Sequence, residues 1–397
     1  MASFRTTIFL LMFGITVISL FTLSFMSIKL IDKKTEAMLE QDLYNYARIV
    51  KQEHSSRLNE ILSSGLTLAN NPRLERLVID DDKDAIKEIL EGLSNANNLD
   101  MAMMVDEEGI VISRANSNLT GDKTGIDIVY YVIDNRWSVA STEIIHEDEL
   151  SKQGISSLTN IRRIPTLYQR ASIKEYETDV ISLVAVIPVG NKYIFLADVL
   201  NKDHSIPDKI KYLTDFDAAI FMDDMIVSTT KATQKGNRFI GTLLTEEVYN
   251  TTILKNRLFY GRTWMINQPA RAIYLPIRDH RSKAIGTLAF WADETEFKKS
   301  AFESMDFSRD IIFISCALIL ISLVLSFFVS IRLTKPINEL IESAIKVSQG
   351  DFEQGVHVKS YAELNKLAAT FNVMIRYIRK QIIEEERKII KEFKGKK

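Results

Sequence analysis

Two long uncharged apolar stretches constrain what this chain can fold into more than any other feature. Residues 8–28 and residues 311–331 each run for 21 positions without a charged side chain. An α-helix rises about 1.5 Å per residue, so each stretch can cross the hydrocarbon core of a bilayer, which is about 30 Å thick. A cleaved signal peptide is the alternative for the first stretch, but its apolar region is usually only about 7–15 residues long, and no small-x-small cleavage site follows here. We therefore predict transmembrane helices at 8–31 and 311–331.

The predicted spans place residues 32–310 on one side of the membrane and both chain ends on the other. Basic residues flank both ends of the first span, so the positive-inside rule does not orient it. Arg332 and Lys335 follow the second span and favour a cytoplasmic C-terminus. The same orientation makes residues 1–7 a short cytoplasmic N-terminus.

Composition and motifs exclude several classes of function. The 397 residues carry a formal net charge of -2 and 26% charged residues, which is typical neither of a disordered chain nor of a nucleic-acid-binding protein. The single cysteine, Cys316, rules out an intrachain disulfide and a cysteine-based zinc site. The sequence has no phosphate-binding glycine loop and no metalloprotease, serine-hydrolase or protein-kinase motif, so we expect no catalytic activity. The one mixed cluster of metal-ligating residue types, Glu143, His146, Glu147 and Asp148, is typical of a solvated helix start, and we expect no metal, cofactor or nucleic-acid partner.

Internal repetition predicts the fold of the segment between the spans. Two β-rich runs around an acidic turn at 103–113 return at 219–229, and a second strand pair at 184–197 returns at 272–290. The pattern predicts an α+β fold made of two modules in series, each an antiparallel sheet with helices to one side. We expect the first module to carry an insertion of about thirty residues, roughly within 114–170.

A long helix is predicted to connect the first span to these modules. Apolar residues recur at three- or four-residue spacing from Leu39 to Leu66, and no proline interrupts them until Pro72. One amphipathic helix of about 35–40 residues is therefore expected to rise from the membrane. His54 lies on its apolar stripe and is expected to be a packed or interface histidine.

A long membrane-emergent helix followed by two PAS-like modules resembles the double Cache sensor domain of the fused Cache type. The residues that carry the resemblance are 125–137, 200–203, 240–242 and 260–262. The resemblance implies an extracytoplasmic ligand-sensing domain of a bacterial signalling protein. Its membrane-distal module, with the stalk helix, would be 32–205, and its membrane-proximal module would be 206–300.

Such domains typically hold a small molecule in the membrane-distal module, which directs attention to a run of aromatic and basic residues. The candidate ligand-binding residues are Tyr130, Tyr131, Arg136, Trp137, Tyr168 and Arg170. A guanidinium beside aromatic faces suits a carboxylate-bearing metabolite, because arginine binds carboxylate through two parallel hydrogen bonds and aromatic rings exclude water. Amino-acid-sensing Cache domains have one residue between Arg and Trp, whereas Arg136 and Trp137 are adjacent, so that specificity is not carried over. In the alternative interpretation the aromatic residues are ordinary core and Arg136 forms a surface ion pair.

The segment after the second span has the pattern of two short heptad helices. A first apolar seam runs from Ile337 to Val347 behind Pro336, which can start a helix, and a second runs over 364–378. Two such helices joined by an extended connector of about 12–14 residues cannot bury both seams alone, so we expect a parallel dimer that forms a four-helix bundle.

This pattern resembles the HAMP signal-relay domain, over 332–386. The matching positions, expected to act as relay residues, are Pro336, Leu340, Gly350, Glu363, Phe371 and Met374. The chain departs from the family at the start of the second helix, where only one acid of the usual pair is present and Asn365 replaces a glycine. That departure affects the expected two-state behaviour of the bundle.

These observations predict a dimeric bacterial inner-membrane receptor with two spans and a periplasmic sensor. Its expected partners are a small-molecule ligand in the periplasm, a second copy of the chain through the stalk and HAMP helices, the lipid bilayer, and a separate cytoplasmic effector. Only a charged tail, 387–397, follows the HAMP-like segment. Two alternatives stay open: a sensor that docks a periplasmic binding protein, or the truncated input half of a histidine kinase, chemoreceptor or diguanylate cyclase.

Overall fold

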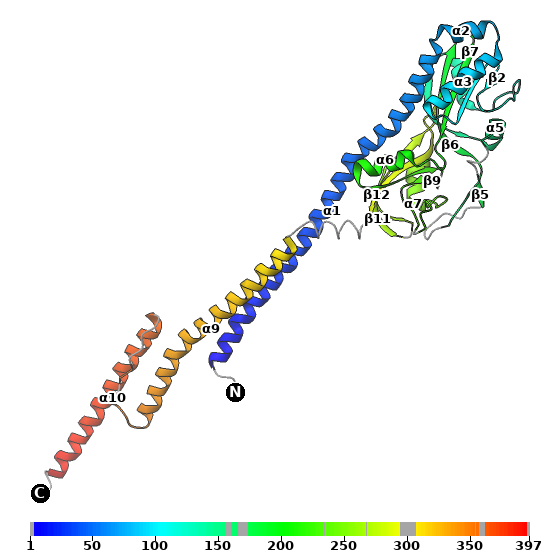
Figure 1. The fold of residues 1–397 in the computed structure, drawn as a ribbon. Helices are drawn as coiled ribbons and strands as arrows, with labels where there is room; N and C mark the ends of the chain where they lie inside the picture. The colour runs from blue at the N-terminus through cyan, green and yellow to red at the C-terminus, as the bar shows by residue number, and fades with distance from the viewer. Residues whose placement is uncertain are drawn as a thin grey trace. The chain divides into compact units, whose positions relative to one another are not determined.

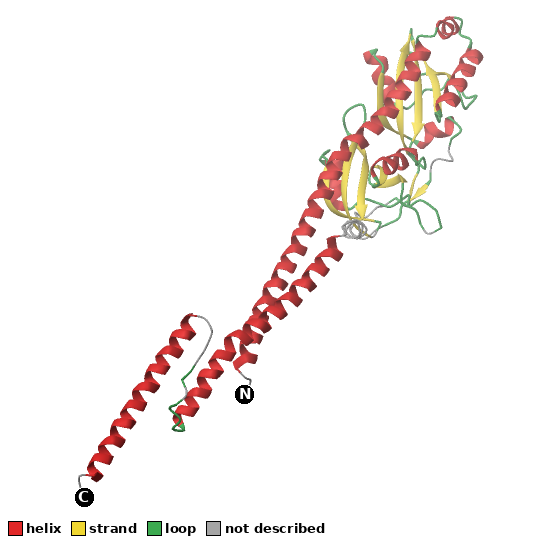
Figure 2. Cartoon of the chain, turned by 60° about the vertical axis from the view of Figure 1, so that its left-hand side comes forward, coloured by secondary structure: helices red, strands yellow, loops and turns green. Residues whose placement is uncertain are grey.

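The chain divides into two compact units. A computed structural model describes residues 4–155, 160–165, 174–233, 235–266, 268–293, 307–353, 355–356 and 362–394. The large unit is Thr35–Ala301, and the helical unit combines Met1–Lys34 with Phe302–Lys397. Figure 1 labels many of the elements along the chain, and Figure 2 distinguishes the strands of the large unit from the helices.

The first helix, α1 (Phe4–Ala69), runs for 66 residues without a break. The prediction of one continuous helix ending before Pro72 is therefore confirmed. Pro72 opens the next helix, α2 (Pro72–Ile79), whose N-cap residue Asn71 accepts a hydrogen bond from the backbone N–H of Arg73. In the large unit, the buried apolar stripe of α1 consists of Leu39, Leu43, Val50, Ile61 and Leu68.

Two five-stranded antiparallel sheets form the large unit. The first module contains α3 (Lys83–Asn97), β1 (Met101–Val105), β2 (Val111–Arg114), α4 (Asp127–Asn135), β3 (Val139–Ile145), α5 (Glu147–Lys152), β4 (Ile161–Arg162), β5 (Tyr176–Glu177), β6 (Val180–Val189) and β7 (Lys192–Val199). The second module contains α6 (Ser205–Thr214), β8 (Asp217–Met222), β9 (Met225–Thr229), α7 (Glu246–Tyr249), the π-helix η2 (Asn250–Leu254), β10 (Phe259–Met265), β11 (Gln268–Arg278) and β12 (Ala284–Asp293). This is the α+β fold with two PAS-like sheets that the sequence predicts.

The two sheets have the same strand order. The first is β2-β1-β7-β6-β3, and the second, written from its other edge, is β9-β8-β12-β11-β10. The internal repetition of the sequence is thereby confirmed strand for strand. The insertion expected within 114–170 occupies the later part of that range and extends past it: α5, β4 and β5 lie between β3 and β6, whereas β10 and β11 form a direct hairpin. The segment before β3 is not extra, because α4 has a counterpart in α7 and η2.

Helices cover both faces of the first sheet, not one side as the sequence pattern suggested. All five residues of β1 are buried, and its side chains enter two different apolar clusters. Ala102 and Met104 pack in the cluster that contains α1 and α3, whereas Met103 and Val105 pack in the cluster that contains α4. A strand buried on both faces is apolar at every position, so its sequence does not alternate.

A short arm of the first module is attached to the second module. The Ile164 N–H donates a 2.8 Å hydrogen bond to the Gly241 carbonyl. Gly241 has φ +89°, and a Cβ there would overlap the carbonyl oxygen of Arg162, so this approach requires glycine. The next side chain, Arg163, is buried, pairs with Glu177 at 2.8 Å, and reaches Asp224 of the second module.

The helical unit contains the second apolar stretch. Helix α9 (Phe307–Ser348) and the corresponding part of α1 are both long and apolar enough to cross a membrane. Pro336 lies inside α9, so a helix does not begin there: the helix that starts at the second apolar stretch continues through the proline. Gly350, with φ +92°, ends this segment as a C-terminal glycine.

The connector of the HAMP-like segment is held by one side chain of the last helix, α10 (Ala362–Lys394). Asn372 accepts a hydrogen bond from the Val356 N–H and donates one to the Val356 carbonyl, both at 2.7 Å. The buried side chains on this side of α10 are Ala368 and Ile375. The two-helix organisation expected after the second span is confirmed.

Candidate functional site

The predicted ligand-binding residues lie on and just after α4. This helix ends at Arg136, whose φ of +59° is left-handed and whose N–H donates to the Val132 carbonyl at 2.8 Å. Tyr130 turns back toward the preceding loop, where its hydroxyl donates to the Thr124 carbonyl at 2.7 Å. The Lys123 ammonium lies 5.4 Å from the centre of the Tyr130 ring.

Arg136 and Trp137 are both exposed. The Arg136 side chain is 62% exposed and pairs with Glu107 at 2.9 Å, and Trp137 is 55% exposed. The ion pair with Glu107 raises the pKa of the Arg136 guanidinium. This is the surface ion pair of the alternative interpretation, so a ligand role for Arg136 stays a prediction.

Tyr131 lies at the boundary between the two modules. Its ring centre is 6.5 Å from that of Trp137 and 5.0 Å from that of His280, which belongs to the second module. The other two candidates, Tyr168 and Arg170, lie outside the described residues.

The sheet face beneath α4 holds buried polar atoms that no sequence pattern predicted. Within the described part of the chain, no hydrogen-bond partner is found for Arg114 Nε, Gln153 Oε1, Ser182 Oγ and Tyr193 Oη. All four side chains are fully buried. An unpaired buried polar group costs about 1–3 kcal/mol, so these four atoms need partners beyond the part of the chain that the structure describes.

Register and contacts place these four residues on the same face. Arg114 is opposite Met103, and the Gln153 amide donates to the Met103 sulfur at 3.3 Å. Tyr193 belongs to the same apolar cluster as Met103. Ser182 lies two residues from both Val180 and Val184 along β6, so it shares their face of the sheet, and both valines pack in that cluster. The one signal for this site in the sequence was Arg114, a charge at the end of the short strand β2.

Arg114 is held by an acid beside that face. Its two terminal nitrogens lie 2.6 and 2.8 Å from the Asp122 carboxylate oxygens, and one also donates to the Leu119 carbonyl at 2.6 Å. The hydrogen bonds from Arg114 hold the pKa of Asp122 below its usual range. The guanidinium is therefore fixed in direction, with Nε left for another acceptor.

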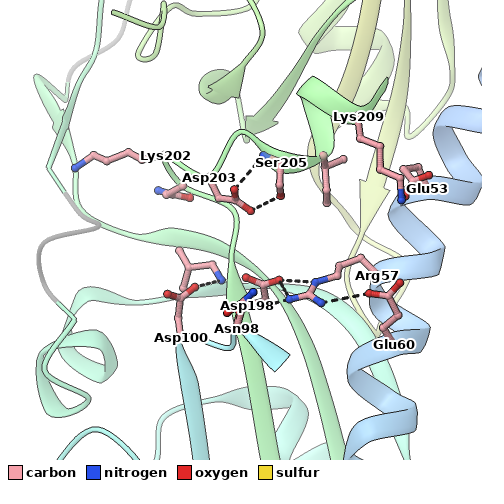
Figure 3. A pocket seen from close by; sticks show the side chains of 13 residues that line it. Glu53, Arg57, Glu60, Asn98, Asp100, Asp198, Lys202, Asp203, Ser205 and Lys209 are labelled. Carbon is pink, nitrogen blue, oxygen red and sulfur yellow. Dashed lines mark hydrogen bonds and ion pairs between the residues drawn. The ribbon is translucent and has the colours of Figure 1, made fainter. Parts of the chain in front are cut away.

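A strongly charged cavity of about 500 Å³ lies where the two modules join α1. Figure 3 shows Arg57 and Asp198 on one side of it and Asp203 with Ser205 on the other. Its charged lining residues are Glu53, Arg57, Glu60, Asp100, Asp198, Lys202, Asp203 and Lys209. Five of these are acids and three are bases, so the cavity favours cations over anions.

Asp198 and Arg57 form the central ion pair of this cavity. Arg57 Nε donates to Asp198 at 2.8 Å, and another nitrogen donates to the Asn97 carbonyl at 2.9 Å. Burial raises the pKa of Asp198 to about 6 despite this pairing. Burial also raises the pKa of Asp100, whose carboxylate accepts the Val199 N–H at 2.7 Å.

The expected HAMP relay residues have the following environments. Pro336 is buried, Leu340 and Phe371 are half-buried, Glu363 is exposed, Met374 is 45% exposed, and Gly350 closes α9. Leu367, on the predicted seam of α10, is 55% exposed. In a single chain, apolar side chains of this seam are therefore exposed.

Two family models match the chain. Residues 198–303 match single Cache domain 3, and residues 328–380 match the HAMP domain. The first match covers the second module, and the second covers the end of α9, the connector and the first part of α10. The chain therefore carries a Cache sensory segment followed by a HAMP segment.

Two curated proteins are similar over part of their length. A sensory transducer protein of Acetivibrio thermocellus is 39% identical over 69 residues, which are 17% of this chain and 12% of that protein. The sensor protein kinase WalK of Staphylococcus saprophyticus is 24% identical over 163 residues, which are 38% of this chain and 24% of that protein. The chain thus spans less than a quarter of the length of either relative.

Solved sensory domains are similar at low sequence identity. The periplasmic domain of Vibrio cholerae LuxQ is 12% identical, with a TM-score of 0.35, and the match covers 63% of this chain and 98% of that one. The sensory domain of the Campylobacter jejuni chemoreceptor Tlp3 is 12% identical, with a TM-score of 0.39, and covers 68% and 98%. The sensor domain of the Vibrio cholerae histidine kinase DctB is 11% identical, with a TM-score of 0.37, and covers 66% and 99%.

Proposed function

We propose that this chain, which carries the Cache and HAMP segments of a sensory transducer, is an inner-membrane receptor for an extracytoplasmic small molecule. The observation that supports this proposal most strongly is the order of the chain's parts: an apolar helix, two Cache-like sheets, a second apolar helix and HAMP. In this arrangement the large unit faces the periplasm and the HAMP segment faces the cytoplasm. The second helix passes the signal to a cytoplasmic output.

The ligand site we propose is the sheet face beneath α4. The four buried polar atoms without described partners support it, because a ligand with matching donors and acceptors would satisfy them. Arg114 Nε and Tyr193 Oη are donors that suit a carboxylate. Tyr130, Tyr131, Arg136 and Trp137 would form or border the wall opposite these atoms. Tyr168 and Arg170, which lie outside the described residues, are proposed as further ligand-binding residues. The proposed class of ligand is therefore a carboxylate-bearing metabolite.

The relay we propose runs through a dimer. In a single chain, apolar side chains on both HAMP helices are exposed: Ile341, Ile345, Leu367 and Met374. A parallel second copy would bury them in a four-helix bundle, with Pro336, Leu340, Gly350, Glu363, Phe371 and Met374 as relay positions. The ligand biases this bundle only through different affinities for two states of the large unit, typically about 1–3 kcal/mol of coupling.

The test uses the full chain in lipid nanodiscs and its own fluorescence. All three tryptophans, Trp137, Trp264 and Trp291, lie in the large unit, so tryptophan emission reports the unfolding of that unit alone. We expect one class in a panel of organic acids, amino acids, amines and purines to raise the unfolding temperature by several degrees, because a ligand stabilises the state that it binds. No shift with any class would contradict small-molecule sensing and favour the docking of a periplasmic binding protein.

Two variants then locate the site. Tyr193→Phe removes a hydroxyl without a described partner, so the free protein should keep or gain stability while the ligand-induced shift falls. Arg136→Ala should abolish the ligand response and leave dimerisation intact. An unchanged dose response in both variants would move the site elsewhere.

A further inference from the structure

A second cavity, of about 330 Å³, lies between α1 and the second module. Four of its ten lining residues come from α1 and five from the hairpin formed by β11 and β12. The lining residues that matter most are Lys51, His54, Leu58, Leu275, Arg278 and Leu288. None of its lining residues belongs to the α4 face, so the two are different sites.

The charged groups of this lining are both cations. Lys51 is exposed on α1 and has no ion pair within the described part of the chain. Arg278 donates from Nε to Asn256 Oδ1 at 2.8 Å and from a terminal nitrogen to the Asn256 carbonyl at 3.3 Å, so its partner is neutral. None of the lining residues is an acid, so two positive charges are left without compensation.

The rest of the lining is mainly hydrocarbon. Leu288 and Ile277 are 2% and 4% exposed and form part of the buried core, whereas Leu258 is 40% exposed at the rim. Leucines from α1 and β11 complete the walls. A buried apolar surface with cations beside it suits a ligand that has an apolar body and an anionic group.

His54 supplies a polar group to the same cavity. Its Nε2 lies 3.0 Å from Thr142 Oγ1 of the first module. Burial lowers the pKa of His54 to about 4, so the imidazole is neutral at pH 7 and can hydrogen-bond without adding charge. The charge preference of the cavity is therefore determined by Lys51 and Arg278.

We propose that this cavity binds a small organic anion with an apolar body, its carboxylate held by Lys51 and Arg278 and its hydrocarbon part against Leu58, Leu275 and Leu288. The occupant would tie α1 to the β11–β12 hairpin. The charged cavity beside Asp198 offers an internal comparison, because its excess of acids would repel the same anion. This site is separate from the one proposed beneath α4.

The experiment compares acids with their neutral amides. Full chain in phosphatidylcholine nanodiscs is titrated by calorimetry with benzoate and hexanoate, and in parallel with benzamide and hexanamide. We expect the acids to bind and the amides to bind about tenfold more weakly or not at all, because the amides lack the charge that strengthens hydrogen bonds from Lys51 and Arg278. Equal binding of acid and amide, or no binding of either acid, would overturn the proposal.

Variants show whether an acid binds in this cavity. Lys51→Gln and Arg278→Gln each remove one cation from exposed positions and should weaken benzoate binding about tenfold. Arg48→Gln removes an exposed cation one turn away on α1 that does not line the cavity, and should bind as the parent does. Binding that survives both glutamine variants but is lost in Tyr193→Phe would place the anion beneath α4 and refute this site without refuting the proposed function.

Discussion

His280 Nδ1 lies 3.0 Å from Glu143 Oε1, and the two residues belong to different modules. The same carboxylate oxygen accepts the backbone N–H of His280 at 2.9 Å. Both side chains are buried, with 2% and 9% exposure, and the Tyr131 ring lies against the imidazole. The turn between β11 and β12 is thus anchored in the first module, next to α4.

Glu143→Ala should destabilise the large unit by about 1–3 kcal/mol, because it leaves two buried donors of His280 without an acceptor. Glu143→Gln keeps an acceptor oxygen and should cost less. The measurement is chemical unfolding followed by tryptophan fluorescence. Glu91→Gln is the matched control: its pair with Lys87 on α3 is exposed, does not involve His280, and should contribute less than about 1 kcal/mol. Equal losses of unfolding free energy in all three variants would show that the buried contact contributes no more to stability than an exposed ion pair.

His54 should make the large unit less stable as the pH falls. Its pKa is about 4 in the folded protein against 6.5 when unfolded, so the unfolded chain binds the proton first as the pH drops. Stability is then lost between about pH 6.5 and pH 4, by up to about 3 kcal/mol. His54→Gln should remove this slope, which is measured as the variant-minus-parent difference in unfolding free energy at several pH values. A difference that stays constant over this range would contradict the burial of a neutral imidazole.

Asp198 should produce a slope of the opposite sign. Its folded pKa of about 6 lies above the ordinary value of 3.8, so the native state keeps the proton to higher pH than the unfolded chain. Stability should therefore fall as the pH rises from about 4 to about 6, by up to about 3 kcal/mol. The two effects partly cancel in the parent. In Asp198→Asn, the free energy of unfolding should rise with pH because of His54. In His54→Gln, it should fall with pH because of Asp198.

The proposed dimer predicts a specific cross-link in the HAMP segment. In a Cys316→Ser background, Leu367→Cys should form a disulfide between two copies under mild oxidation, because seam positions of parallel helices face each other. Lys366→Cys, one residue away and exposed, should cross-link much less. The readout is the fraction of dimer on a non-reducing gel. Equal cross-linking at both positions would indicate random collision and not a defined bundle.

Local patterns in the sequence predicted the elements but not the long-range contacts. The two apolar helices, the continuous α1 and the repeated sheets follow from spacing and composition, which act over a few residues. The contact between His280 and Glu143 joins positions 137 residues apart, and no local pattern carries it. Helix α9 continues through Pro336 because its long apolar segment is already helical before the proline.

The candidate site shows the same division. The run from Tyr130 to Trp137 was identified from its residue types, yet Arg136 is at the surface and paired with Glu107. Tyr193 was missed because its burial depends on which loops cover its face of the sheet. Arg114 was detectable as a charge at the end of the short strand β2, but strand ends carry charges so often that this signal is weak without the structure.

Because of the arm from Ile161 to Ile164, neither module is a self-contained folding unit. The second module contains the Cache match, yet Asp224 is paired with Arg163 of the first module, and Gly241 is shaped to receive its backbone. A second module expressed or transplanted alone would therefore expose an unpaired acid and an open strand edge at this junction. Chimeric receptors built from this chain should exchange the whole segment from Thr35 to Ala301, because the boundary between the modules is not a place where the protein can be cut.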